Sequence, residues 1–247
     1  MSAETSLYRR HRPQAFDQVV GQEHVVRTLR NAVERDRVHH AYLFVGSRGT
    51  GKTSVAKILA RSLNCVDGPT LNPCGKCESC VSIAAGTSLD VIEMDAASNR
   101  SVDDVRELRE RVGFAPAAGR WKVYILDEAH MLTKEAWNAF LKTLEEPPPN
   151  TVFVLATTEP QKVMPTIVDR CQRFDFQRPS LEQIAEVIGR VATAEGIEIS
   201  DGAIAAIATH DSHSPHGSVV GPRSQLRHRA RIFAIEVFPV PREPTNR

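Results

Sequence analysis

The sequence predicts an α/β fold in which helices flank a mostly parallel β-sheet. Short apolar runs rich in β-branched residues alternate with segments of helical periodicity over the first 180 residues. Such alternation is typical of β-α-β crossovers, which connect parallel strands. A glycine-rich segment follows the first apolar run, and two acidic residues end a later one. Ligands bind at such strand ends in doubly wound sheets.

The individual elements follow from apolar runs, helical periodicity and helix boundary signals. Strands are expected in four runs, at residues 41–46, 89–94, 123–127 and 152–156. Helices are expected at residues 23–36, 52–63, 102–112, 134–144 and 181–194, and from about 201 to 209. Three prolines at 147–149 end one helix. Ser180, with Gln183 three residues later, starts another as a capping box.

Composition excludes several classes of protein. The 247 residues include 31 Lys and Arg against 30 Asp and Glu, and 41% are hydrophobic. This is the composition of a folded chain, and its near-neutral charge disfavours a nucleic-acid binder that relies on bulk positive charge. There is neither an apolar stretch of about 18 residues nor a signal-peptide pattern, so we expect a cytoplasmic protein without a membrane span.

The glycine-rich segment matches the phosphate-binding pattern G-x-x-x-x-G-K-[ST] between an expected strand and an expected helix. Backbone N–H groups of such a loop surround the phosphates of a nucleotide, and the helix N-terminus adds positive potential. Lys52 would contact the β- and γ-phosphates, and the Thr53 hydroxyl would bind Mg2+. The alternative is a glycine-rich turn with an incidental lysine. The candidate residues are Gly46, Ser47, Arg48, Gly49, Thr50, Gly51, Lys52 and Thr53.

Polar residues end two other expected strands. Asp127 and Glu128 end a hydrophobic run. The Asp127 carboxylate would hold Mg2+, and the Glu128 carboxylate would polarise the attacking water. Alternatively, Glu128 only caps the next helix. Thr157 and Thr158 close the run at 152–156, and a polar side chain there would lie beside the γ-phosphate if the strands are neighbours. Otherwise these threonines simply end a strand.

Four of the five cysteines fall within 16 residues. Two overlapping C-x-x-C motifs share Cys77, and the fourth cysteine, Cys65, lies at the end of the helix that follows the phosphate loop. Four thiolates favour a closed, structural Zn2+ site. An iron–sulfur cluster and unliganded thiols are the alternatives. The four are Cys65, Cys74, Cys77 and Cys80, whereas Cys171 is expected to be a buried or half-buried thiol.

The sequence resembles the γ/τ subunits of bacterial DNA polymerase III clamp loaders, a family of AAA+ ATPases built on a P-loop NTPase fold. The resemblance is dense over about residues 7–178 and loose over 179–209, and the four-cysteine insertion makes it specific. Besides the phosphate loop and cysteines, the matching segments are 8–16 (YRRHRPQAF), 19–22 (VVGQ), 39–44 (HHAYLF), 95–98 (DAAS), 126–132 (LDEAHML), 141–147 (LKTLEEP), 155–158 (LATT) and 169–171 (DRC).

The resemblance implies domains and site residues. It implies an AAA+ domain at 1–178 with a zinc insertion at about 64–82, a partial helical lid at 179–209, and ATP between them. Val19 and Val20 would border the adenine, with Arg12 close to the nucleotide. Thr158 would be the sensor 1 residue. Arg170 would be an arginine finger that reaches the ATP of an adjacent subunit. Asp169 stands where the family has Ser, so a surface Asp169–Arg170 pair is the alternative.

The family pattern stops after about Thr209. Residues 210–247 lack helical or strand periodicity, the lid arginine called sensor 2 and the family's collar domain. The hypothesis is that this irregular or disordered tail comes from a shifted reading frame or a truncation. Weak nucleotide binding, poor assembly and slow hydrolysis would follow.

The function implied is an ATP-hydrolysing clamp-loader subunit of the DNA polymerase III holoenzyme, with ATP, Mg2+ and Zn2+ as cofactors. Its partners would be other subunits of a hetero-oligomeric ring, the sliding clamp and, through the assembled complex, primed DNA. Two alternatives are a zinc-containing nucleotide-binding scaffold subunit and a different AAA+ remodeller of DNA.

Overall fold

The computed structural model describes residues 7–99 and 101–212. These residues fall into two compact units: residues 13–178, and residues 7–12 together with 179–212. The longer segment of the second unit begins at Pro179, where the sequence predicts a junction. Residues 7–12 were expected in the first domain but group with the second, because Leu7 packs in its small apolar core.

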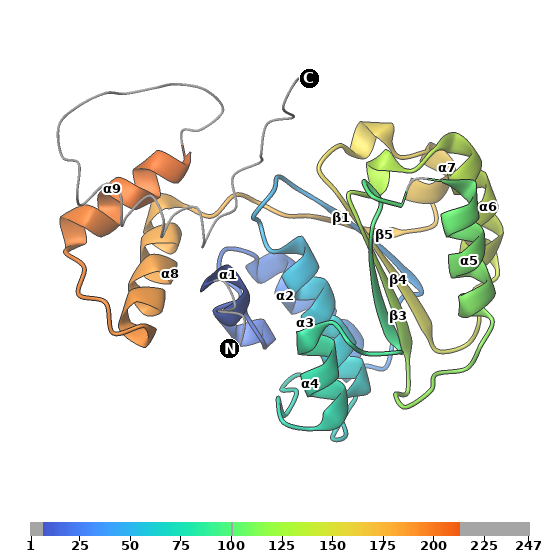
Figure 1. Cartoon of the computed structure of the whole chain (residues 1–247), viewed down its shortest axis with the longest axis horizontal. Helices are drawn as coiled ribbons and strands as arrows, with labels where there is room; N and C mark the ends of the chain where they lie inside the picture. The colour runs from blue at the N-terminus through green and yellow to red at the C-terminus, as the bar shows by residue number, and fades with distance from the viewer. Residues whose placement is uncertain (1–6, 100, 213–247) are drawn as a thin grey trace, which may run out of the picture. The chain divides into compact units, whose positions relative to one another are not determined.

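The first unit is built on one five-stranded sheet in which all paired strands are parallel (Figure 1). The strand order is β2-β3-β4-β1-β5, so β1 lies between β4 and β5. Consecutive strands of a parallel sheet need crossovers, which the helices supply. The strands are β1 (Ala41–Val45), β2 (Val91–Asp95), β3 (Lys122–Asp127), β4 (Thr151–Thr157) and β5 (Gln172–Asp175).

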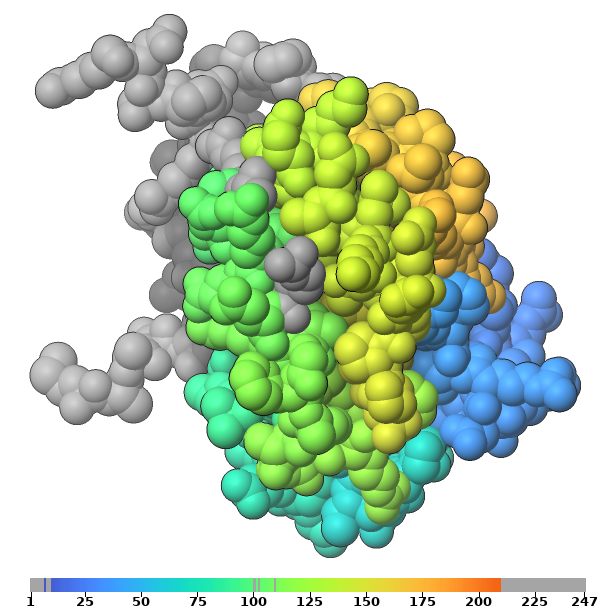
Figure 2. All heavy atoms as spheres, turned by 90° about the vertical axis from the view of Figure 1, so that its right-hand side faces the viewer, coloured from blue at the N-terminus to red at the C-terminus, as the bar shows by residue number. Residues whose placement is uncertain are grey.

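Helices cover both faces of this sheet (Figure 1). One face carries α2 (Glu23–Glu34), α3 (Lys52–Asn64) and α4 (Glu78–Ala85). The other carries α5 (Val102–Val112), α6 (Lys134–Glu145) and the short α7 (Pro165–Val168), and Figure 2 shows the surface that α5 and α6 form. Three 3-10 turns complete this unit: η1 (Phe16–Gln18), η2 (Ala129–Met131) and η3 (Pro160–Lys162).

Alternation along the strands creates one apolar core on each face. Tyr42 and Phe44 pack with α2 and α3, whereas Leu43 packs with α5, α6 and α7. Successive side chains of a strand point to opposite faces, so a strand buried on both sides is apolar throughout. This explains the continuous apolar runs of the central strands β1, β3 and β4.

The expected helices and the four apolar strands are all present, with ends shifted by a few residues. The sequence analysis did not include β5 or α4. β5 is an edge strand with the sequence QRFD, of which only Phe174 is buried, so it lacks an apolar run. α4 lies inside the cysteine insertion and has only eight residues.

The second unit contains α1 (Leu7–Arg10), α8 (Leu181–Ala194) and α9 (Asp201–Ser212). Both predicted starts are capped: Ser180 and Gln183 form the capping box of α8, and the Ser200 hydroxyl accepts the Ala203 N–H at 3.3 Å at the start of α9. α9 continues three residues past the predicted end at Thr209. The rest of the tail, 213–247, lies outside the described residues. No helix described is both long and apolar enough to cross a membrane.

Candidate nucleotide site and cysteine cluster

The phosphate-loop residues connect β1 to α3, as the motif requires. The Gly46 N–H donates to the Thr157 carbonyl at 3.1 Å, which fixes the loop's first residue to the end of β4. A Cβ at Gly46 would lie 2.8 Å from the Phe176 Cβ and carbonyl, so only glycine fits there. Gly51 adopts φ +93° immediately before α3, a conformation that favours glycine. The loop is therefore shaped by its neighbours as well as by its own sequence.

Lys52 begins α3 and lies inside the curve of the loop. Its side chain is largely buried, and its ammonium donates to the carbonyls of Gly46 and Ser47, both at 2.8 Å. Burial lowers the pKa of Lys52, while the nearby carboxylates of Asp127 and Glu128 raise it. A cation held in this way can exchange loop carbonyls for phosphate oxygens without leaving the loop.

Thr53 and Asp127 meet at the carboxyl edge of the sheet. The Thr53 hydroxyl donates to Asp127 Oδ2 at 2.8 Å, and the Glu128 N–H donates to Asp127 Oδ1 at 2.9 Å. A hydroxyl and a carboxylate are the hard oxygen donors that Mg2+ accepts beside substrate phosphates. The donor set therefore fits this ion.

Glu128 stands at the N-cap position of η2, but its side chain contacts the phosphate loop. Its Oε1 accepts from Arg48 Nε at 2.9 Å and its Oε2 accepts from the Thr158 hydroxyl at 3.1 Å. It makes no capping hydrogen bond to η2, so the alternative that it merely caps the next helix is wrong. Arg48, Glu128 and Thr158 thus come from three separate segments of the chain.

His130 belongs to the same network, although the sequence analysis did not single it out. Its imidazole is nearly buried, with Nδ1 3.0 Å from the Thr157 hydroxyl and 3.5 Å from Glu128 Oε2. Its Nε2 lies 3.4 Å from Glu159 Oε1. Its sequence signals are its place two residues after Glu128 and its position inside the matching segment 126–132.

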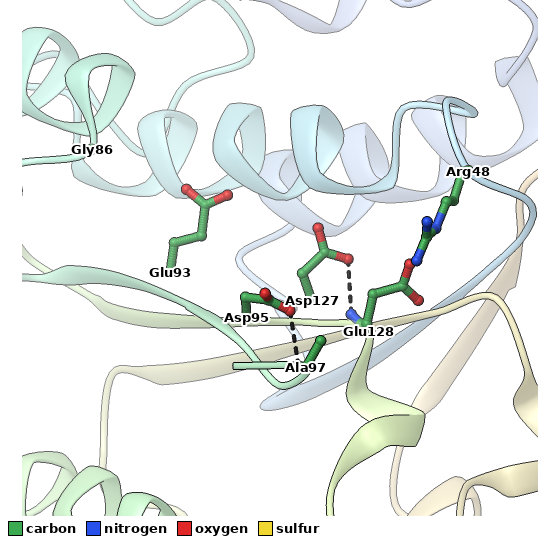
Figure 3. Close-up of a pocket in the computed structure, with 7 residues that line it drawn as sticks. All are labelled: Arg48, Gly86, Glu93, Asp95, Ala97, Asp127 and Glu128. Atoms are coloured by element: carbon green, nitrogen blue, oxygen red, sulfur yellow. Dashed lines mark hydrogen bonds and ion pairs between the residues drawn. The ribbon is translucent and has the colours of Figure 1, made fainter. Parts of the chain in front are cut away.

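An open hollow of about 510 Å³ lies beside these residues (Figure 3). Acidic side chains dominate its lining, and the one basic lining residue, Arg48, pairs with Glu128. At its far end Glu93 pairs with Lys57 at 2.6 Å. The lining residues are Arg48, Gly86, Glu93, Asp95, Ala97, Asp127 and Glu128.

Other predicted residues lie elsewhere. Val19 packs half-buried against the core on the α2–α3 face, and Val20 is half-buried beside it in sequence. Arg12 belongs to the second unit. Arg170 donates to Glu145 Oε1 at 2.5 Å and to the Thr166 carbonyl at 2.6 Å. The alternative Asp169–Arg170 pair is wrong, because Glu145 is the carboxylate that holds this guanidinium.

The four clustered cysteines come together as one donor set. Their sulfur atoms all lie within 4.8 Å of one another, and no described cysteine forms a disulfide. The N–H groups of Cys74, Cys77 and Cys80 each donate to the sulfur of the preceding cluster cysteine, at 3.3–3.4 Å. Four converging sulfurs, two buried and two half-buried, fit a tetrahedral zinc ion. The pKa of the isolated Cys171, by contrast, is raised by burial to about 12.

A family model described as "DNA polymerase III, delta subunit" matches residues 21–180. The chain belongs to the DNA polymerase III clamp-loader subunit family. It is 52% identical over 204 residues to DNA polymerase III subunit tau of Bacillus subtilis, covering 83% of this chain and 36% of that protein. It is 49% identical over 216 residues to subunit gamma/tau of Mycobacterium tuberculosis H37Rv, covering 87% and 37%. The chain thus spans about a third of the length of these relatives.

Solved structures confirm the fold class. The RuvB Holliday junction branch migration motor of Thermotoga maritima superposes with a TM-score of 0.59 over 80% of this chain and 59% of that chain. At 23% identity this likeness shows the AAA+ fold alone.

Proposed function

We propose that this chain binds ATP with Mg2+ and hydrolyses it as the motor region of a DNA polymerase III clamp-loader subunit. The observation that carries the proposal is the meeting of three segments at one sheet edge. The phosphate loop, the acidic end of β3 and the threonine after β4 converge within hydrogen-bond distance. This is the arrangement that phosphoryl transfer from a nucleotide requires.

The roles proposed for the residues follow from their positions. Lys52 would neutralise charge on the β- and γ-phosphates, and Thr53 with Asp127 would hold Mg2+ between the phosphate oxygens. Glu128 would orient the attacking water, and Thr158, which already donates to Glu128, would lie beside the γ-phosphate. Arg48 is mostly exposed, so its ion pair with Glu128 is weak and a nucleotide could displace it.

Arg170 is proposed to act on the nucleotide of an adjacent subunit. It precedes β5, whose first residue Gln172 pairs with Tyr42, whereas the phosphate loop follows Val45 at the other end of β1. Arg170 therefore lies toward the edge of the sheet opposite its own phosphate loop. An arginine placed there can serve a neighbour's ATP within a ring, which makes hydrolysis dependent on assembly.

The wider role extends this proposal to the replication complex. The relatives are named as subunits of DNA polymerase III. We therefore propose that the partners of this chain are other clamp-loader subunits, a sliding clamp and primed DNA. The proposed location is the cytoplasm. Zinc in the cysteine cluster would be structural, since four thiolates leave no open position for substrate. A nucleotide-binding scaffold without hydrolysis is the second candidate, and Glu128 is the residue that separates the two.

Two substitutions distinguish the motor from the scaffold. Lys52→Ala should weaken ATP binding at least tenfold, because a buried cation aimed at the phosphates is lost. Glu128→Gln should leave ATP affinity within about threefold while reducing hydrolysis by about 10² to 10⁴-fold. Equilibrium ATP titration and single-turnover hydrolysis, measured in the complex reconstituted with its partner subunits, check both. Equal ATP affinity in Lys52→Ala would overturn the site, and undiminished turnover in Glu128→Gln would overturn the role of Glu128.

A further inference from the structure

Arg61 is a buried arginine whose charge the nucleotide site does not use. It lies on α3 and is only 4% exposed. Its Nη1 donates to the backbone carbonyl of Gln14 at 2.9 Å and to the Gln14 side-chain oxygen, whereas its Nε has no hydrogen-bond partner. No carboxylate within the described residues forms an ion pair with it. Besides the Gln14 oxygens, the Arg61 guanidinium contacts the side chain of Cys80 in the cysteine cluster. A buried cation without a carboxylate partner is costly, so a negative group is expected nearby.

The surroundings of Arg61 point to the cysteine cluster. Arg61 lies one helical turn before Cys65, whose N–H donates to the Arg61 carbonyl at 2.8 Å. Residues four apart lie on the same face of a helix. On the other side, a Cβ built on Gly75 would be 3.5 Å from Arg61 Nη2. Gly75 follows Cys74 directly, so the guanidinium lies against the loop that carries the cluster.

The opposite charges of Arg61 and of a metal-loaded cysteine cluster explain why the two lie together. Four thiolates outweigh the charge of one divalent cation, so a metal-loaded cluster is an anion, and here two of its sulfur ligands are buried. We propose that Arg61 is the internal counter-charge of the four-cysteine metal centre and ties that centre to Gln14. Arg61 is thus a positioning residue for the metal site and touches neither nucleotide nor substrate. The inference stands independently of ATP hydrolysis.

A zinc competition experiment on the full chain tests the proposal. Arg61→Met removes the charge at similar length, and Arg61→Lys keeps a charge without the planar fork. Arg120→Met is the matched control, because Arg120 also contacts the insertion, donating to the Val66 carbonyl at 3.1 Å, but is exposed. Titration of the zinc-loaded proteins with a chelator should show affinity reduced by about 10 to 100-fold in Arg61→Met. Arg61→Lys should lose less, and Arg120→Met should match the parent.

A second measurement separates a counter-charge from ordinary packing. In the chelator-stripped, reduced protein the metal centre whose charge Arg61 would balance is absent. Arg61→Met should therefore lower the thermal midpoint of the zinc-loaded protein and leave unchanged or raise that of the stripped protein. Zinc affinity equal to the parent, or equal loss of stability in both forms, would overturn the proposal. If Arg61→Met does not fold, Arg61→Gln is compared with Arg61→Lys: tighter zinc binding by the Lys variant supports a counter-charge, and equal affinities refute it.

Discussion

Single residues fix loops whose own sequences have little regular structure, and Asp90 is the clearest case. Its carboxylate is nearly buried and accepts the N–H groups of Ala117, Ala118 and Gly119 at 2.5–2.8 Å. Burial opposes ionisation of Asp90, but these three N–H groups prevail and hold its pKa below the ordinary value. One side chain before β2 thus shapes the segment that leads into β3.

Replacing Asp90 by Ala should destabilise the protein by about 2–4 kcal/mol at pH 7, because three N–H groups lose their acceptor. The sign of the pH dependence follows from the lowered pKa. The carboxylate contributes fully above the unfolded-state value of about 3.9, and its contribution is lost as the pH falls below that toward the folded-state pKa. Urea unfolding of parent and variant, compared at equal pH, checks this, because zinc loss in acid affects both. A stability difference that grew on acidification would contradict the prediction.

Whole elements link sites that are far apart. α3 begins at Lys52 in the phosphate loop and ends at Asn64, next to Cys65 of the metal cluster. At about 1.5 Å per residue, its 13 residues place the two sites about 20 Å apart. The same helix therefore carries the candidate nucleotide site at its start and the cysteine cluster at its end. In the second unit α8 depends on its own start signal, the capping box of Ser180 and Gln183.

Removing this cap tests whether the second unit is a separate element of stability. Ser180→Ala should cost about 1 kcal/mol, because one N–H at the start of α8 loses its acceptor. Both tryptophans, Trp121 and Trp137, lie in the first unit. Denaturant unfolding should therefore show a shifted midpoint by far-UV circular dichroism and an unchanged midpoint by tryptophan fluorescence. Equal shifts by both probes would show that the two units unfold together.

At the scale of the whole molecule, sheet topology separates the two ends of the proposed catalytic machinery. The phosphate loop, Asp127 and Glu128 gather at the carboxyl edge of the sheet, while Arg170 is held by Glu145 toward the opposite edge. A chain built in this way has the proposed nucleotide-binding half of a site at one edge and the proposed finger at the other. Assembly side by side would complete each site.

Mixing variants tests this arrangement. Arg170→Ala should bind ATP normally but reduce hydrolysis at least tenfold in the reconstituted complex, since arginine fingers contribute about 10³ to 10⁵-fold. Adding Lys52→Ala protein, which keeps Arg170, should restore part of the activity. Glu145→Ala is the matched control, because it breaks the same exposed ion pair yet leaves the guanidinium in place. Full turnover by Arg170→Ala alone would rule out a role in trans.

Local patterns identified much of the protein. The phosphate loop, the acidic pair and the cysteine spacing are contiguous or nearly so, and each needs only its own residues to indicate its chemistry. The central strands β1, β3 and β4 were also predictable, because burial on both faces makes them largely apolar. The edge strand β5 was missed because one buried side chain, Phe174, gives no pattern.

The sequence by itself determined the set of chemical groups and the alternation of strands and helices, because both depend on residues that are close together in the chain. Only the tertiary structure decided which distant groups meet. Arg48 with Glu128, Arg61 with Gln14 and Arg170 with Glu145 are 80, 47 and 25 residues apart. Such pairs depend on strand order and helix placement, which result from packing over the whole sheet and leave no mark in the local sequence.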